Sequence, residues 1–198
     1  MSFARGTALS RCYLNHRYSD DLDFFVNNHS GFKDQCNKVI AFFKQSEWDY
    51  DVATTSDTFL RLFLENDNMT MKVDFVNDVP FHYGEFEKLP IFHRVDNWRN
   101  ILSNKVSALN RLEAKDIADI LFTAQKYPFE WEDIILEARK KDLWVDPVEI
   151  CKLIKEFPVE LLLGIKWIAE IDIEKVKGAI NILHDDIFYG HKNSLSVS

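Results

Sequence analysis

The spacing of hydrophobic and polar residues changes near residue 95 and divides the chain into two parts. In the first part, apolar and polar residues alternate with the two-residue period of a β-strand over Asp21–Val26, TFLRLFLE and MTMKVDFV. The residues ENDN between the last two stretches favour a tight turn, so these two stretches are predicted to form a hairpin. Apolar residues three or four positions apart predict one amphipathic helix from about residue 31 to residue 47.

The segments HYGE and KLPIF, before residue 95, are interpreted as a loop and a sheet edge. In the second part, apolar residues have the spacing of helices almost to the end of the chain. Helices are predicted in NWRNILSNKVSALNR, AKDIADILFTAQKY, EWEDIILEARKKD, DPVEICKLIKEF, PVELLLGIKWIAE and DIEKVKGAINILHDDIF. Asp146 is suited to cap the fourth of these helices, and Pro147 to occupy its first position. We therefore expect an α+β fold, with a mixed sheet and flanking helices in residues 1–94 and a helical bundle in residues 95–198.

Composition narrows the class of protein. The formal net charge of −8 argues against a protein that coats nucleic acid through a broad basic surface, although it allows a local basic groove. The three cysteines are widely spaced with no CxxC pair, which argues against a zinc site or a disulfide framework and fits a reducing cytosol. The most apolar run, VELLLGIKWIA, is interrupted by Lys166 and falls short of the roughly 20 residues of a membrane span. We expect a cytoplasmic protein with no membrane partner.

The segment HRYSDDLDFF places two carboxylates, Asp21 and Asp23, one residue apart in an otherwise apolar strand. Alternate residues of a strand share a face, so these carboxylates would lie about 7 Å apart and repel one another. Asp74 in MKVDFV has a similar setting, and an adjacent strand could bring it to the same place. Three carboxylates could hold Mg²⁺ or Mn²⁺, which polarises a nucleoside triphosphate and activates an attacking oxygen. The alternative is an edge strand whose acids face solvent.

Upstream of the acidic strand, Gly6 and Thr7 lead from a turn into a helix-like segment, whose backbone N–H groups could hold a triphosphate. Taken together, GTALSRCYLNHRYSDDLDFF resembles the AbiEii/AbiGii toxin family of nucleotidyltransferases, within the DNA polymerase β-like superfamily. The matching residues of the acidic strand are Arg17, Ser19, Asp21, Leu22, Asp23, Phe24 and Phe25, and KVDFV with Asp74 matches the strand of the third carboxylate. The resemblance implies the nucleotidyltransferase type of sheet.

A second family signature matches NKVSALNRLEAKDIADIL through Lys105, Arg111, Lys115, Asp116 and Asp119. Beside an acidic strand pair, Lys105 could reach triphosphate oxygens as a point charge. Asp116 could orient that lysine, bind the nucleotide or prepare the acceptor hydroxyl. Arg111 could contact phosphate or RNA, and Asp119 is expected to pair with a buried basic group. Without the resemblance, this block would be interpreted as a surface helix with pairs of opposite charges four residues apart.

The resemblance implies an Mg²⁺-dependent enzyme that moves a nucleoside monophosphate from a nucleoside triphosphate to an acceptor hydroxyl. In this hypothesis Asp74 completes the metal site or deprotonates the acceptor. The family further implies a toxin of a toxin–antitoxin or abortive-infection system, used in phage defence, with RNA such as tRNA as acceptor and a co-encoded antitoxin as partner. RNA would contact a local basic patch, formed by Arg11, Arg17, Lys72, Lys105 and Arg111.

Two alternatives stay open. Where the family has two glycines, this chain has Arg5 before Gly6, and the motif begins close to the first residue of the sequence. These departures favour a catalytically degenerate relative that binds a nucleotide or a partner protein. The second alternative is protein nucleotidylation, in which the same chemistry modifies a serine, threonine or tyrosine.

Overall fold

The computed structural model describes residues 5–66, 69–89 and 92–196, and the chain forms two compact units. The first unit comprises Met1–Ala8 and Ser19–Asp96, and the second comprises Leu9–Tyr18 and Asn97–Ser198. The boundary expected between residues 94 and 95 lies close to the last of these junctions. The segment Leu9–Tyr18 belongs with the helical unit, although the sequence pattern grouped it with the sheet.

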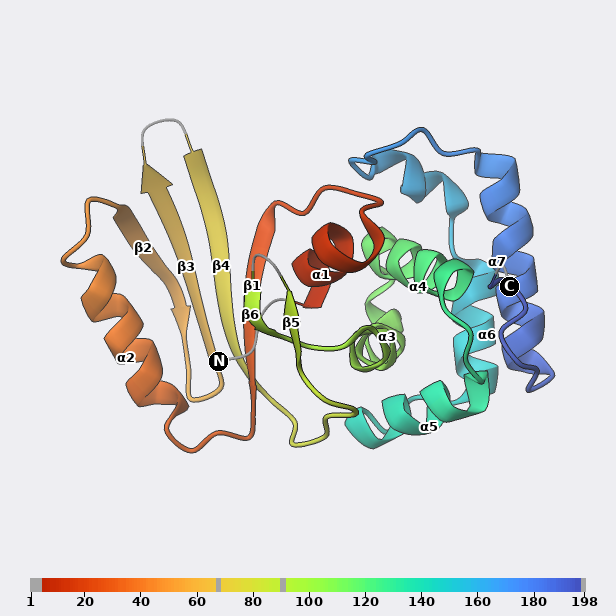
Figure 1. The fold of residues 1–198 in the computed structure, drawn as a ribbon, viewed down its shortest axis with the longest axis horizontal. Helices are drawn as coiled ribbons and strands as arrows, with labels where there is room; N and C mark the ends of the chain where they lie inside the picture. The colour runs from red at the N-terminus through yellow and green to blue at the C-terminus, as the bar shows by residue number, and fades with distance from the viewer. Residues whose placement is uncertain (1–4, 67–68, 90–91, 197–198) are drawn as a thin grey trace. The chain divides into compact units, whose positions relative to one another are not determined.

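Four strands form a mixed sheet in the first unit, which Figure 1 shows. Their order across the sheet is β1 (Asp21–Asn27), β4 (Met69–Asp78), β3 (Phe59–Asn66) and β2 (Asp49–Thr55). β1 and β4 are parallel, whereas the other two neighbouring pairs are antiparallel. The predicted mixed sheet and the predicted β3–β4 hairpin are confirmed. The turn of that hairpin, at residues 67–68, lies outside the described residues.

One face of the sheet packs against α2 (Phe32–Phe43), which lies along the strands in Figure 1. Leu60, Leu62 and Leu64 of β3 alternate toward this helix and are almost fully buried, together with Phe32 of the helix. Because successive residues of a strand point to opposite faces, the intervening positions lie on the other face, where the charged residues of the strands are found. The helix ends at Phe43, a few residues before its predicted end.

The sequence pattern did not predict β2, whose residues are mostly exposed and do not alternate clearly between apolar and polar. The region expected to be a loop and a sheet edge forms a small antiparallel pair, β5 (Glu87–Leu89) and β6 (Phe92–Val95). A short helix, α1 (Arg5–Ala8), precedes the sheet in the chain and contacts β1.

The second unit is helical, as predicted. It contains α3 (Trp98–Ser107), α4 (Ala114–Lys126), α5 (Trp131–Lys141), α6 (Pro147–Glu156) and α7 (Ile173–Phe188), preceded in the chain by a π-helical turn over Leu9–Leu14. No helix within the described ranges has both the length and the apolar character that a bilayer span requires. The predicted start of α6 is confirmed, because the Asp146 carboxylate accepts a hydrogen bond from the N–H of Val148 and Pro147 is the first helical residue.

The helix predicted over PVELLLGIKWIAE is wrong. Only a 3₁₀ turn forms, over Val159–Gly164, and Trp167 then pairs with Arg17 in an isolated β-bridge. In this run Leu162 is buried whereas Leu161 and Leu163 are half exposed or more, so the leucines do not form one apolar helical face.

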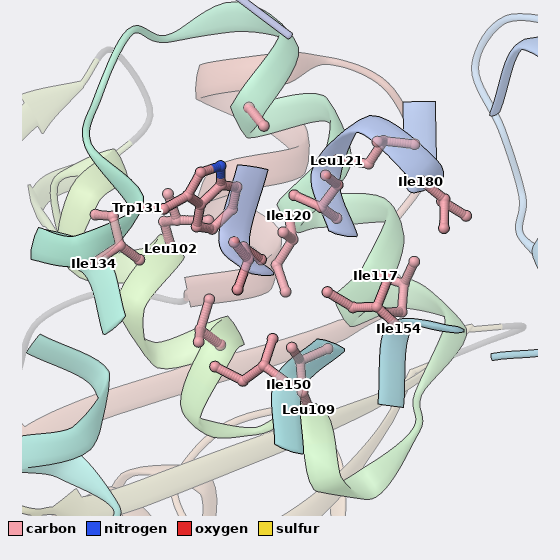
Figure 2. Close-up of a cluster of buried hydrophobic side chains, with 14 of the residues drawn as sticks. Leu102, Leu109, Ile117, Ile120, Leu121, Trp131, Ile134, Ile150, Ile154 and Ile180 are labelled. Carbon is pink, nitrogen blue, oxygen red and sulfur yellow. The ribbon is translucent and has the colours of Figure 1, made fainter. Parts of the chain in front are cut away.

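The helices of the second unit enclose one hydrophobic core, which Figure 2 shows. Leu102 of α3 and Ile117, Ile120 and Leu121 of α4 are almost fully buried in it. Trp131 of α5 is inaccessible to solvent and meets Phe129 edge-on, with their ring centroids 4.8 Å apart. This packing fixes α3 and α4, the two helices that carry Lys105 and Asp116.

Candidate functional site

The three predicted metal carboxylates come from adjacent strands. β1 carries Asp21 and Asp23, β4 carries Asp74, and the register pairs Asp23 with Asp74. The prediction that Asp74 lies on a strand next to the other two is therefore confirmed. The residues that follow Asp23 and Asp74 point to the α2 side, where the rings of Phe24 and Phe75 stack with their centroids 5.0 Å apart. The strand alternation thus places all three carboxylates on the face that α2 does not cover.

Basic residues on neighbouring strands compensate two of these carboxylates. Arg61 of β3 donates from Nε to Asp74 Oδ1 at 2.8 Å and from Nη2 to Asp74 Oδ2 at 2.7 Å. Lys72 Nζ lies 2.9 Å from Asp21 Oδ2. No role for Arg61 was predicted from the sequence. This residue alternates with the buried leucines of TFLRLFLE and is the register partner of Asp74. The available signal was the alternation itself, once the hairpin register is known.

The fit of this face to a divalent cation is partial. Carboxylate oxygens are the donors that Mg²⁺ prefers, and the register brings the three strand positions together. Nevertheless, the described residues contain no group of three His, Cys, Asp or Glu side chains arranged to hold a metal ion. At Asp74, both carboxylate oxygens accept hydrogen bonds from Arg61. The donor set therefore fits the ion in chemistry and register, and Arg61 is a cation that competes with a bound ion for the oxygens of Asp74.

The predicted phosphate-binding turn differs from the structure. Gly6 and Thr7 lie within α1 instead of in a turn that precedes a helix. Thr7 is buried, and its hydroxyl donates to the backbone carbonyl of Asp21 at 2.5 Å and lies 3.1 Å from Ser19 Oγ. The hydroxyl proton of Thr7 therefore fixes the first residue of β1.

In the second unit, a buried network surrounds Lys105. Its Nζ lies 2.6 Å from Asp116 Oδ1 and 2.9 Å from Asp119 Oδ2. Arg17 donates to both oxygens of Asp119 at 2.8 Å, and His16 Nε2 lies 2.9 Å from Asp119 Oδ1. The prediction that Asp119 pairs with a buried basic group is confirmed. For Asp116 the contact with Lys105 is observed, whereas the proposed contacts with nucleotide and acceptor stay predictions.

Two members of the network, Lys105 and Asp119, have pKa values that favour their charged forms. Burial disfavours the charged form of Lys105, but the charges of Asp119 and Asp116 outweigh it and raise the pKa of the ammonium above 10.5. Burial likewise opposes ionisation of Asp119. The charge of Lys105, with hydrogen bonds from His16 and Arg17, overcomes this and lowers the pKa of Asp119 well below 3.8. Lys105 is therefore an ammonium that can donate hydrogen bonds to an anion.

The expected basic patch for RNA is wrong at two of its positions. Arg17 is only 5% exposed and Lys105 only 9% exposed, because both point into the carboxylate network. Arg111 has an exposed side chain, and its Nη2 lies 3.6 Å from Asp116 Oδ2. Lys72 forms an ion pair with Asp21.

A pocket of about 310 Å³ lies in the second unit and contains none of the predicted site residues. It is lined by apolar residues that include Phe157 and by the polar residues Lys155, Lys177 and His184. Lys177 is paired with Glu174 at 3.0 Å, and His184 with Asp185 at 2.9 Å. The residues that line this pocket are therefore different from the site residues that the sequence predicted.

Comparison with known proteins identifies relatives of this arrangement. A family model described as the nucleotidyl transferase AbiEii toxin of type IV toxin–antitoxin systems matches residues 3–175. MenT4, a nucleotidyltransferase toxin from Mycobacterium tuberculosis H37Rv, has 14% identity and a TM-score of 0.61, with 95% of this chain and 75% of that chain covered. JHP933 from Helicobacter pylori has 19% identity and a TM-score of 0.59, with 95% and 83% covered. No curated protein matches the chain. At these identities the structural likeness shows the fold, and it confirms the predicted nucleotidyltransferase type of sheet.

Proposed function

The chain belongs to the AbiEii family of nucleotidyl transferase toxins of type IV toxin–antitoxin systems, and on that premise we propose that it transfers a nucleoside monophosphate to an acceptor hydroxyl. The donor is a nucleoside triphosphate. The acceptor oxygen forms a bond to the α-phosphorus, the bond to the pyrophosphate oxygen breaks, and pyrophosphate leaves.

The observation that carries this proposal is the register of β1 and β4. It pairs Asp23 with Asp74, one pleat from Asp21, on the sheet face that α2 leaves uncovered. Structural packing gives no reason to place three carboxylates at such positions, since like charges on neighbouring strand positions destabilise a sheet. Arg61 and Lys72 offset the repulsion in the absence of a ligand. An ionic function explains why the acids are there.

We assign Asp21, Asp23 and Asp74 to hold a divalent cation, Mg²⁺ or Mn²⁺. When bound, such an ion neutralises phosphate oxygens and makes the attacking oxygen more acidic. Lys105 remains protonated and donates hydrogen bonds to phosphate oxygens, while Asp116 holds its ammonium in place. The exposed Arg111 supplies a further positive charge for phosphate or RNA.

The proposed acceptor is RNA, with the acceptor end of tRNA as the first candidate, and the proposed partner is an antitoxin encoded with the toxin, in a system of phage defence. The family description supports the toxin–antitoxin role. Because the net charge is −8 and both Arg17 and Lys105 are buried, contact with RNA would depend on exposed basic residues such as Arg111 and Arg11. The expected cytoplasmic location stays a prediction.

The decisive experiment follows the transfer of label from each α-³²P nucleoside triphosphate to a mixed RNA pool in Mg²⁺. The double variant Asp21→Asn, Asp23→Asn should lose transfer by on the order of a thousandfold, because the ion contributes several kcal/mol to the transition state. Asp57→Asn is the matched control, since Asp57 is an exposed acid that pairs with the exposed Lys33 at 3.1 Å. Unchanged transfer in the double variant would contradict the proposal.

The same assay separates the two alternatives. Label that migrates with protein instead of RNA would indicate protein nucleotidylation. If Mg²⁺ with a triphosphate raises the melting temperature and no labelled product forms with any acceptor, the chain is a degenerate nucleotide-binding relative.

A further inference from the structure

Asp119 joins two cations in the buried network of the helical unit. Arg17 holds it through two hydrogen bonds, and Lys105 contacts one of the same oxygens. Asp119 is completely buried, and the Arg17 side chain is 5% exposed. Burial of this many ionised groups is expensive unless each is compensated, and such clusters are typical of functional sites.

The charged groups around Lys105 come from two parts of the chain. α4 contributes Asp116 and Asp119, and the segment Leu9–Tyr18 contributes Arg17 and the ring of His16. Apart from the imidazole, the buried network contains two cations and two anions. If Arg17 were uncharged, the two carboxylates would outweigh Lys105, and the surroundings of the ammonium would repel a polyanion such as a triphosphate.

Asp119 and Asp116 differ in the partners that each would keep if the Lys105 ammonium moved away. Asp119 would keep both hydrogen bonds from Arg17 and the contact with His16. Asp116 would keep no close partner, because its buried Oδ2 lacks a hydrogen bond and Arg111 is 3.6 Å away. Loss of the Asp119 contact is therefore the smaller change, since an unpaired buried carboxylate is unfavourable.

From these contacts we infer that Arg17 is a positioning residue of the nucleotide site, which acts on Lys105 through Asp119. By satisfying Asp119, Arg17 lets the ammonium exchange its Asp119 contact for a phosphate oxygen while it stays anchored to Asp116. This inference rests on the proposed function, because it assigns the anion to the triphosphate donor. Ammonium groups have three N–H donors, so one can serve Asp116 while another serves the ligand.

The experiment compares Arg17→Gln with Arg17→Lys and with Arg99→Gln. Arg99 is a matched control in the same unit: it donates to Glu137 at 2.8 Å and has no contact with the Lys105 network among the described residues. The first measurement is the ¹⁵Nζ resonance of the Lys105 ammonium in the unliganded chain, assigned with Lys105→Arg. The second is the dissociation constant of a non-hydrolysable triphosphate analogue in Mg²⁺.

Arg17→Gln is expected to broaden or abolish the Lys105 resonance and to weaken analogue binding by roughly tenfold to a hundredfold, the scale of a misplaced binding group. Arg17→Lys should restore part of both, and Arg99→Gln should keep both at wild-type values even where it lowers the melting temperature. An unchanged Lys105 resonance in a folded Arg17→Gln chain would overturn the inference, as would analogue binding equal to that of Arg99→Gln. A wild-type chain that binds no triphosphate would contradict the proposed function. The Lys105 resonance is measured without a ligand, so it still tests whether Arg17 positions Lys105 in that case.

Discussion

At the scale of single residues, Arg61 determines whether Asp74 is available. Arg61→Gln should lower the free energy of unfolding by about 1–2 kcal/mol, less than for a fully buried pair because the Arg61 side chain is 36% exposed. Mg²⁺ should then stabilise the variant more than the wild-type chain, because the oxygens of Asp74 no longer have a competing cation. Urea unfolding with and without Mg²⁺ measures both effects.

The control for this prediction is Lys33→Gln, which removes an ion pair whose side chains are both largely exposed. It should change stability by no more than about 0.5 kcal/mol and leave the response to Mg²⁺ unaltered. An equal response to Mg²⁺ in Arg61→Gln and wild type would show that Arg61 and the ion do not compete for Asp74.

The acidic members of the site could be predicted from the sequence, because strand alternation and spacing mark them locally. Asp21, Asp23 and Asp74 fall on such a pattern, and the structure confirms their adjacency across β1 and β4. Their cationic partners were not predictable in this way. Arg61 meets Asp74 only through the hairpin register, and Arg17 meets Asp119 across 102 positions of sequence.

At the scale of elements, α6 begins at a cap that the sequence already indicated. Asp146 accepts a hydrogen bond from the Val148 N–H at 3.0 Å, and Arg139 Nη2 lies 2.6 Å from its other oxygen. Asp146→Ala should cost about 1 kcal/mol of unfolding free energy, because an N–H at the helix start loses its acceptor. Asp146→Asn keeps the capping oxygen and loses the charge, so it should cost clearly less. Thermal unfolding by circular dichroism measures the difference, and equal losses would assign the effect to Arg139 instead of to the cap.

Elements were predictable where one face of the element is buried along its whole length. α4 has such a face, with Ile117, Ile120 and Leu121 in the core, and its prediction is confirmed. The run Val159–Gly164 is equally rich in leucine, but Leu161 and Leu163 are exposed and no helix forms there. β2 is the opposite case, because it is held by pairing with β3 and carries no apolar pattern. The amino-acid composition of these two segments therefore predicts neither the absence of the helix nor the presence of the strand.

At the scale of the whole molecule, the chain passes between its two units three times, after Ala8, Tyr18 and Asp96. Only the last passage coincides with a change of hydrophobic period in the sequence. The segment Leu9–Tyr18 joins the helical unit through contacts that no local pattern encodes, such as the hydrogen bond from the Ile168 N–H to the His16 carbonyl at 3.0 Å. The ion pairs of Asp119 with Arg17 and Lys105 belong to the same set of contacts, so the stability of the helical unit should depend on pH through them.

The sign of that dependence follows from the direction of the pKa shift. The pKa of Asp119 is lowered in the folded chain because Lys105, His16 and Arg17 favour its ionised form despite burial. Its contribution to stability is therefore complete above the ordinary value of 3.8 and is lost as the pH falls toward the folded value. Asp119→Asn should be much less stable than wild type at about pH 7, and the difference should shrink below about pH 4 by up to about 1.4 kcal/mol per pH unit.

Tryptophan fluorescence in urea is a suitable probe, because Trp98, Trp131, Trp144 and Trp167 all belong to the helical unit and only Trp48 belongs to the other. A local probe is needed since two units need not unfold in one transition. Asp57→Asn, which changes an exposed acid, should give a curve parallel to wild type throughout. If the Asp119→Asn curve were also parallel from about pH 7 to about pH 2, the pKa of Asp119 would have to be the same in the folded and the unfolded chain, which would contradict the stabilisation of its carboxylate by Lys105, His16 and Arg17.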